Sequence, residues 1–222
     1  MSYLSRIMTV SALAATTTLF SFSPATAKDE AKNWNIDTAH SSANFAVKHM
    51  MVSNVRGRFP KVKGSAEYDG KKVKSIKVEA EIETASVDTD NDKRDEHLKG
   101  KDFFAVEKFP KMKFVSKKAV PNGKGKFKLI GDLTLHGVTK QVTLDVEGPT
   151  QAVKDPYGKT RVGASASTTI NRKDFGITYG GVLDNGGAVV SDDVKISLDI
   201  ELVKNAAEKK SEAKESTKKK AS

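Results

Sequence analysis

Apolar and polar residues alternate with a period of two along the central part of the chain. Residues 194–202 read VKISLDIEL and residues 76–83 read IKVEAEIE, so every second side chain is apolar. Successive side chains of a β-strand point to opposite faces of the sheet, and this alternation is therefore typical of strands with one buried and one solvated face. The pattern predicts β-strands in both segments.

The same alternation recurs often enough to predict an all-β protein. It appears at residues 43–47, 55–68, 111–117, 127–135, 142–146 and 162–170. Together with the two segments above this gives about eight strands, separated by turn-forming residues and without a helical crossover that could connect parallel strands. The pattern favours an antiparallel sandwich or a closed barrel over a fold built from β-α-β units.

The register of one hairpin follows from the sequence. If His136 and Gly137 form a two-residue turn, Leu135 faces Val138. The same register pairs Gly131 with Val142, Leu129 with Leu144, and Phe127 with Val146. A slip of one residue would place each of them opposite a charged or hydroxyl side chain, so the apolar pattern specifies this register. His136 is accordingly interpreted as a turn residue, with a metal or catalytic role as the alternative.

One segment, from Asp90 to Phe104, departs from the strand pattern. Asp90 or Asn91 can cap a short helix that runs to Lys99 and ends at Gly100. The apolar side chains of this mainly charged segment are Leu98, Phe103 and Phe104. We expect either a lid or plug, or a connection whose aromatic rings cover one end of a barrel.

Residues 1–27 have the features of an export signal. A mainly apolar stretch, residues 7–22, follows a single positive side chain, and Ala25-Thr26-Ala27 matches a small-x-small cleavage site. Cleavage after Ala27 predicts a periplasmic or secreted protein, with an uncleaved membrane anchor as the alternative.

The last residues, 204–222, predict a disordered, Lys-rich tail. They hold seven Lys and three Glu and no aromatic or β-branched aliphatic residue that could be buried. The tail is interpreted as a solvated extension, or as a segment with weak electrostatic attraction to an anionic membrane surface. The folded domain is then expected over residues 28–203.

Composition excludes several kinds of chemistry. The chain has no cysteine, which excludes disulfides, zinc–thiolate sites, iron–sulfur clusters and a cysteine nucleophile. The signal segment and the tail hold half of the formal net charge of +10, so the body is only mildly basic. We therefore expect no nucleic-acid partner.

The residue types of a hydrolase triad occur close together at the start of the body. Asp37, His40 and Ser41 are such near neighbours that they cannot easily converge as a triad does, and the G-x-S-x-G turn is missing. Alternating acids at residues 88–92 lack the Gly and Glu of a calcium loop, and helix capping explains them better. The sequence predicts no catalytic residue and no metal site.

Small residues interrupt the inward-facing apolar positions. They are Ala43, Ala80, Gly131, Ala164 and Ala166. In an eight-stranded barrel such residues can leave a lumen for one small ligand, whereas in a sandwich they permit close packing. The pattern alone leaves a ligand-holding lumen and a filled core open.

The sequence resembles the YceI-like polyisoprenoid-binding family over about residues 33–203. The similarity rests on a series of motifs in order: WNIDTAHS at 34–41, FAVKH at 45–49, VRGRF at 55–59, DEHL at 95–98 with DFF at 102–104, KFP at 108–110, GDLTLHGVT at 131–139 and RKDFG at 172–176. The resemblance implies an eight-stranded antiparallel, lipocalin-like barrel with one short helix and an apolar lumen. It also implies a long isoprenoid or other fatty lipid as ligand, no cofactor and no enzymatic step.

The resemblance and the alternation together predict the residues of the site. Ligand contacts are expected from Phe45, Val47, Phe59, Ile82, Phe103, Phe104, Phe114, Phe127, Leu129 and Phe175, and polar contacts with a head group or within the fold from His40, Ser41 and Arg56. The predicted function is a periplasmic carrier or storage protein for a long-chain lipid. The alternatives are a barrel enzyme that acts on a lipid and a structural envelope stress protein with a filled core.

Overall fold

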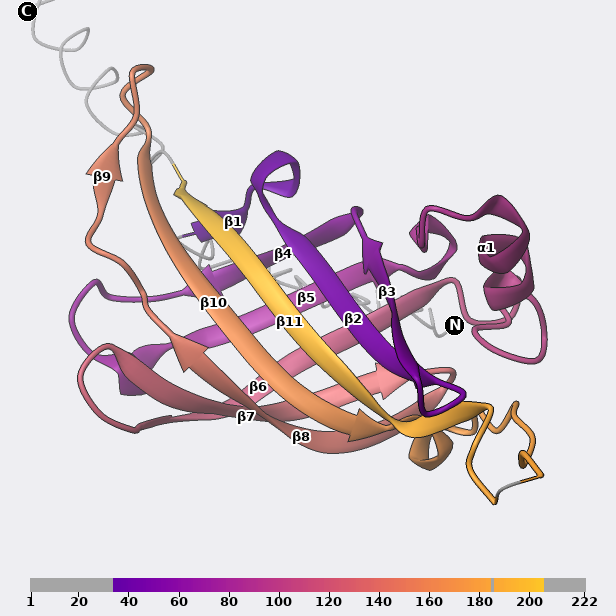
Figure 1. Ribbon diagram of the computed structural model, residues 1–222. Helices are drawn as coiled ribbons and strands as arrows, with labels where there is room; N and C mark the ends of the chain where they lie inside the picture. The colour runs from indigo at the N-terminus through magenta and orange to yellow at the C-terminus, as the bar shows by residue number, and fades with distance from the viewer. Residues whose placement is uncertain (1–33, 185, 206–222) are drawn as a thin grey trace, which may run out of the picture. The chain divides into compact units, whose positions relative to one another are not determined.

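The computed structural model describes residues 34–184 and 186–205, and almost all of its regular structure is β-strand (Figure 1). The strands are β1 (Trp34–Ile36), β2 (Ser42–His49), β3 (Ser53–Phe59), β4 (Val62–Glu67), β5 (Lys77–Glu83), β6 (Lys111–Pro121), β7 (Lys126–Leu135), β8 (Val138–Glu147), β9 (Val153–Lys154), β10 (Thr160–Asn171) and β11 (Val190–Lys204). The helices are α1 (Asp92–Lys99) and the 3₁₀ helices η1 (Thr38–His40), η2 (Val73–Ser75), η3 (Thr84–Ser86) and η4 (Arg172–Phe175).

The predicted signal segment, residues 1–27, and residues 206–222 of the predicted tail lie outside the described residues. Both assignments therefore stay predictions. Within the described part of the chain, no helix is long and apolar enough to cross a membrane.

The strands form a closed antiparallel barrel, as the sequence predicts. β1 and β2 lie one after the other along the same edge of β11, where Ile36 faces Leu202 and Ala43 faces Leu198. β3 and β4 together occupy the next strand position around the barrel, because β3 pairs with β2 and β4 pairs with β1. From β4 the barrel continues through β5, β6, β7, β8 and β10, and β10 pairs with β11 to close it. With β1–β2 and β3–β4 each counted as one interrupted strand, the barrel has eight strands, and the two-residue β9 is an addition to β10.

The prediction of one strand over residues 55–68 was wrong in detail, because the strand is broken after Phe59. Pro60 lies at the break between β3 and β4. Proline has no backbone N–H to donate to a neighbouring strand, so it ends the ladder there. β6 in turn extends beyond the predicted Lys117 to Pro121, past a shift of register between Ser116 and Lys118.

The hairpin of β7 and β8 has the predicted register. Leu135 faces Val138, Gly131 faces Val142 and Phe127 faces Val146. His136 and Gly137 both have positive φ, 50° and 76°, as a two-residue hairpin turn of type I′ requires. The His136 ring lies 4.6 Å from that of Phe109, and its Nδ1 is 3.2 Å from the Phe175 carbonyl oxygen. His136 is thus a turn residue that packs against its surroundings.

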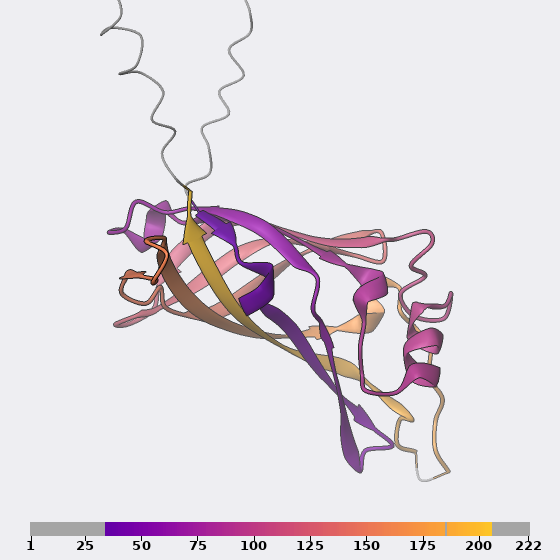
Figure 2. The same cartoon turned by 90° about the horizontal axis from the view of Figure 1, so that it is seen from above.

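The predicted short helix is also confirmed. The Asn91 side chain accepts a hydrogen bond from the Arg94 N–H at 3.0 Å, and Gly100 is the C-terminal cap. The buried Asp95 carboxylate accepts a hydrogen bond from the Thr89 N–H, also at 3.0 Å, which fastens the helix to the preceding segment. Figures 1 and 2 both show α1 beyond the strand ends, at the same end of the barrel as the β2–β3 turn and the connection from η4 to β11.

Candidate functional site

The inward faces of the strands enclose a cavity of about 270 Å³. Its lining comes from all eight barrel strands and is almost entirely apolar. Among the described lining residues, Arg172 carries the one charged side chain, and Asn44, Tyr68 and Thr168 are the polar ones. The structure therefore has the apolar lumen that the sequence pattern left open, and the alternative of a filled core was wrong.

Small side chains contribute to this space in two ways. Ala43, Ala80, Ala164 and Ala166 line the cavity directly. Gly131 instead makes room for an aromatic ring, because a Cβ atom at this position would lie 2.6 Å from Cζ of Phe114. The residues predicted from the small-residue pattern thus serve the lumen, but Gly131 does so by accommodating Phe114.

The structure places all but one of the predicted lumen residues along the cavity. Those that line it are Phe45, Val47, Phe59, Ile82, Phe103, Phe104, Phe114, Phe127 and Leu129. Phe175 is not in the lining: it lies in η4, where it is almost fully buried in the core beside the cavity. Contact of these side chains with a ligand stays a prediction.

The last turn of α1 and the segment after it line one end of the cavity. Leu98, Phe103 and Phe104 belong to the lining, and the rings of Phe104 and Phe59 lie edge to face with centroids 5.4 Å apart. Outside them, the ring of Tyr179 lies 4.7 Å from that of Phe103 and 5.0 Å from that of His97. This aromatic cluster covers the barrel end, as both interpretations of the segment from Asp90 to Phe104 require.

Arg172 lies at the same end and is 4 % exposed. Its guanidinium donates to the carbonyl oxygens of Ser191 and Ile177 at 2.9 Å and to that of Val190 at 3.2 Å. Burial lowers its pKa from the ordinary value, while the charge of Asp192, 3.4 Å from Nη2, acts in the opposite direction. Arg172 therefore holds together the two ends of the connection between η4 and β11.

The alternation of β10 indicates that Arg172 points inward, which the sequence-based prediction of site residues missed. Alternate residues of β10, from Ala164 to Ile170, face the cavity. Arg172 is the next alternate position after Ile170. The alternation therefore predicts an inward direction for this charged side chain, just after the strand ends. A charge at an inward position indicates a structural or binding role.

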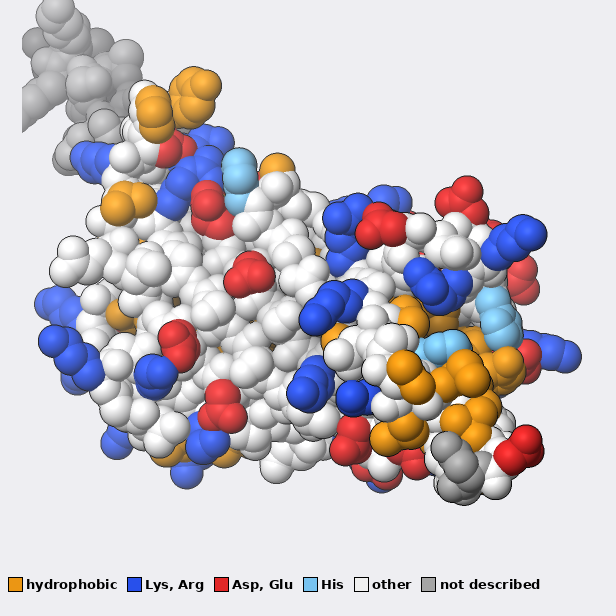
Figure 3. Space-filling model, in the orientation of Figure 1, with side chains coloured by type: hydrophobic (Ala, Val, Ile, Leu, Met, Phe, Trp, Pro, Cys, Tyr) orange, Lys and Arg blue, Asp and Glu red, His pale blue; other side chains and the backbone are white. Residues whose placement is uncertain are grey.

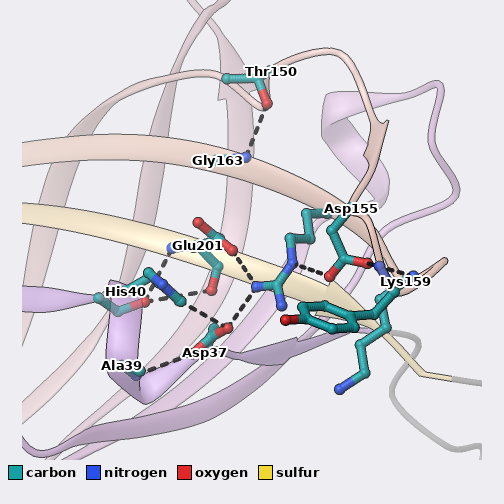
Figure 4. Close-up of polar contacts among 11 residues, drawn as sticks. Asp37, Ala39, His40, Thr150, Asp155, Lys159, Gly163 and Glu201 are labelled. Atoms are coloured by element: carbon teal, nitrogen blue, oxygen red, sulfur yellow. Dashed lines mark hydrogen bonds and ion pairs between the residues drawn. The ribbon is translucent and has the colours of Figure 1, made fainter.

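A second polar cluster lies at the opposite end of β10, around Arg161 (Figure 4). The Arg161 guanidinium donates to Asp37 at 2.6 Å, to Asp155 at 2.7 Å and to Glu201. The hydrogen bond from Arg161, followed by that from His40, lowers the pKa of Asp37 from 3.8 to about 2. Asp37, His40 and Glu201 are close enough together to share a metal ion, but the Arg161 guanidinium already donates to both carboxylates and offsets part of their charge.

The predicted polar contacts, His40, Ser41 and Arg56, are not in the cavity lining. His40 lies in the Arg161 cluster, with Nδ1 3.1 Å from Asp37 and its side chain 61 % exposed. The buried Ser41 hydroxyl accepts from the N–H of Glu201 at 3.0 Å and donates to its carbonyl oxygen, which joins the residue before β2 to β11. Arg56 lines a polar hollow on the outer surface instead. Any contact with a head group stays a prediction.

The comparison with protein families agrees with this architecture. The family model described as YceI-like domain matches residues 34–202. The chain belongs to this family. UPF0312 proteins of Staphylococcus aureus, for example those of strains N315 and bovine RF122, are 37% identical over 169 residues, which cover 76% of this chain and 96% of theirs.

Several solved structures have the same fold. BcnA of Burkholderia cenocepacia superposes with a TM-score of 0.64 at 25% identity, over 75% of this chain and 98% of its own. The YCEI protein of Campylobacter jejuni gives a TM-score of 0.62 at 33% identity, over 72% and 90%. A domain of Saccharophagus degradans, described as a polyisoprenoid binding domain, gives a TM-score of 0.58 at 16% identity, over 78% and 99%, and this last likeness concerns the fold alone.

Proposed function

We propose that the chain binds a long-chain isoprenoid or similar lipid in the barrel cavity and acts as a carrier or store, without a catalytic step. The observation that carries the proposal is the cavity itself, which is lined by apolar side chains from every barrel strand. Burial of an apolar chain contributes about 0.8 kcal/mol per CH₂ group, so such a lining binds hydrocarbon without any charged contact. The polyisoprenoid binding described for the Saccharophagus degradans domain is consistent with this ligand class.

The size of the cavity bears on how a long chain is held. Its volume of about 270 Å³ lies just below the range of about 300–1,000 Å³ that is usual for small-molecule sites. A lipid of tens of carbons therefore requires the aromatic rings on the wall to rotate, or part of the chain to leave the barrel at one end. The rings of Phe45, Phe59 and Phe104, packed with centroids 5.4–5.6 Å apart, are the side chains whose rotation would lengthen the lumen.

A barrel enzyme built on Asp37, His40 and Ser41 has less support. The Ser41 hydroxyl is engaged by the backbone of Glu201, and the His40 ring is exposed beside Asp37. A nucleophile and its base must lie within hydrogen-bond reach and next to the substrate. These residues lie outside the apolar cavity, where a lipid substrate would have to be.

The proposed place of action is the periplasm. The support is the signal-like sequence of residues 1–27, which ends in Ala25-Thr26-Ala27. Mass determination of the protein recovered from the periplasmic fraction tests this proposal, because cleavage after Ala27 predicts a chain that begins at Lys28.

Native mass spectrometry tests lipid binding directly. We expect the purified protein to carry a co-extracted lipid, or to take up an added polyprenol or fatty amide. Phe114→Asp should abolish uptake, because a carboxylate in the apolar lumen costs several kcal/mol to desolvate or protonate. The neighbouring Val115→Asp, at an outward position that is 46 % exposed, is the matched control. Equal uptake by the two folded variants, or only the bare protein mass under all conditions, would contradict the proposal.

A further inference from the structure

One end of the barrel carries an exposed apolar patch, here called the mouth patch. It consists of Met50 (45 % exposed), Met51 (53 %), Val52 (84 %), Tyr179 (41 %) and Val182 (80 %). Figure 3 shows the apolar side chains that gather at this end, whereas most of the face over β10 and β11 is neither apolar nor charged. Contiguous exposed apolar surface in a protein marks a site of interaction.

The contributing segments are held side by side. The Met50 N–H donates to the carbonyl oxygen of Val189 at 2.8 Å, which joins the β2–β3 turn to the connection before β11. Within that connection Val182 forms a β-bridge with Ala188. The ring contact of Tyr179 with Phe103 joins the same connection to the segment after α1. The mouth patch is therefore a single surface formed by segments far apart in the sequence.

This surface continues into the cavity. Phe103 contacts Tyr179 of the mouth patch on one side and lines the cavity on the other. Ile177 and Val190, near the two ends of the connection that carries Tyr179 and Val182, also belong to the cavity lining. Apolar side chains are therefore continuous from the mouth patch to the lumen.

The turn that presents Met50 and Met51 has an unfavourable backbone. Their φ angles are 51° and 60°, and the Val52 N–H closes the turn on the His49 carbonyl oxygen at 3.0 Å. Positive φ at two successive positions favours Asn and Gly, and a bulky side chain there costs free energy. Methionine does not lower the free-energy cost of positive φ, and these two side chains are not buried in the core. We therefore infer that they serve an interaction with another molecule.

Charged side chains of both signs lie next to the mouth patch. Lys48 and Lys101, both exposed, lie next to the turn and next to the Asp102–Phe104 segment, and within the described residues neither has a carboxylate at ion-pair distance. Such ammonium groups can meet lipid phosphates. Asp102 and Asp184, which are also exposed, balance these two lysines, so burial of the apolar side chains must provide the binding.

We propose that the mouth patch docks onto a phospholipid bilayer, with Met51, Val52 and Val182 inserted among the lipids, and that the ligand passes there between the bilayer and the cavity. The proposal rests on the lipid-binding function proposed above. A bilayer is favoured as the occupant because the surface is continuous with a lumen of the same apolar character.

The experiment compares two sources of one labelled polyprenol: phosphatidylcholine vesicles and a soluble cyclodextrin complex. The variant Met51→Asp/Val182→Asp removes apolar surface from the mouth patch. The control variant Val153→Asp/Tyr157→Asp makes the same change in charge at the opposite end of β10. Its two positions are also exposed, Val153 by 59 % and Tyr157 by 88 %. Val52→Asp alone serves as the second variant if the double variant does not fold. Vesicle co-sedimentation at high salt and the rate of uptake from each source are measured on the full mature chain.

We expect the mouth-patch variant to bind vesicles about tenfold more weakly than the wild type and the control, and to take up polyprenol from vesicles more slowly by a similar factor. Its uptake from cyclodextrin should equal that of the wild type. Equal vesicle binding by the two double variants would overturn the proposed docking surface. A dimer-to-monomer change confined to the mouth-patch variant would also overturn it, because the surface would then serve self-association. Absence of uptake from cyclodextrin by the wild type would instead overturn the proposed lipid-binding function.

Discussion

The ring of Phe45 occupies the space that a side chain at position 57 would need. Gly57 faces Phe45 across β2 and β3, and a Cβ atom there would lie 2.4 Å from Cζ of Phe45 and 2.7 Å from Cγ2 of Thr89. Phe45 also packs against Phe59, with ring centroids 5.6 Å apart. The absence of a side chain at Gly57 therefore sets the position of a ring on the cavity wall.

Gly57→Ala should destabilise the fold because Phe45 and Thr89 must both move. Overpacking of this kind costs about 1–3 kcal/mol of unfolding free energy, which urea denaturation measures. Gly163→Ala, in β10, is the control, since its Cβ atom would be 3.7 Å or more from every neighbour. An unfolding free energy of Gly57→Ala within error of that of the control would show that Phe45 is not held by position 57.

Ala166→Phe should reduce lipid uptake by filling the cavity. Ala166 is on the cavity wall, and a ring there displaces part of the ligand chain. Each pair of displaced methylene groups weakens binding by about tenfold, at about 0.8 kcal/mol per CH₂. Ser167→Phe, at the neighbouring exposed position, should leave the affinity unchanged. Titration with a fluorescent polyprenol compares the two, and equal affinities would place the ligand elsewhere.

The strands and their register were predictable from the sequence because each strand has one solvated face, whereas the choice of a barrel over a sandwich rested on the resemblance to the YceI-like family. The alternation in β5, β7 and β11 and the register at His136 and Gly137 follow from side chains that are either inside or outside. The break at Pro60 was missed because the apolar alternation was read across it, although proline cannot donate a ladder hydrogen bond. Arg172 was missed because its inward direction was not followed beyond the end of β10.

The polar part of the predicted site could not be derived in the same way. His40 and Ser41 are adjacent in sequence, yet one is exposed beside Asp37 and the other is buried against Glu201, because η1 interrupts the strand alternation between β1 and β2. The mouth patch depends on contacts between segments separated by more than a hundred residues, such as Met50 with Val189, which no local pattern contains.

His40→Ala should leave lipid binding unchanged if the cavity is the site. The ring lies outside the cavity lining and contacts Asp37 at the surface. We expect the same polyprenol affinity as for the wild type, within a factor of about two, and no hydrolysis of prenyl esters or diphosphates by either protein. Turnover that disappears with His40→Ala would favour the enzyme alternative.

Asp37 should make stability depend on acid pH. Its pKa of about 2 in the folded protein is below its ordinary value of 3.8, so folding favours the ionised form. This stabilisation is complete above about pH 4 and is lost as the pH falls through the folded-state value of about 2. Asp37→Asn should therefore flatten the dependence of the unfolding free energy on pH in this window.

At neutral pH we expect Asp37→Asn to lower Tm by about 2–4 °C. Glu81, whose pKa is also lowered to about 2, by Lys111 and then Lys113, provides a comparison. Its side chain is 39 % exposed against 17 % for Asp37, so water screens its ion pairs more and Glu81→Gln should change Tm less. A larger effect of Glu81→Gln would contradict the expectation that the less exposed Arg161 cluster stabilises the fold more.

Arg172→Met should loosen the connection between η4 and β11. The substitution keeps an apolar stem in the cavity wall but leaves the carbonyl oxygens of Ile177, Val190 and Ser191 without their donors. Loss of these buried hydrogen bonds should cost about 2–4 kcal/mol, and hydrogen exchange should rise first in the peptides that contain Ile177 and Val190. Arg172→Lys keeps the charge but cannot donate in three directions from a planar group, so it should resemble Arg172→Met.

Lys173→Met is the control for the loss of charge in this test, because Lys173 is exposed and shares Asp192 with Arg172, at 2.9 Å. Its exchange pattern should match the wild type. Because Tyr179 and Val182 lie on the same connection, the Arg172→Met protein should also load polyprenol faster than the wild type from a soluble complex, since that end of the cavity opens more often. Wild-type exchange protection in Arg172→Met would mean that the aromatic cluster of His97, Phe103 and Tyr179 alone keeps the barrel end closed.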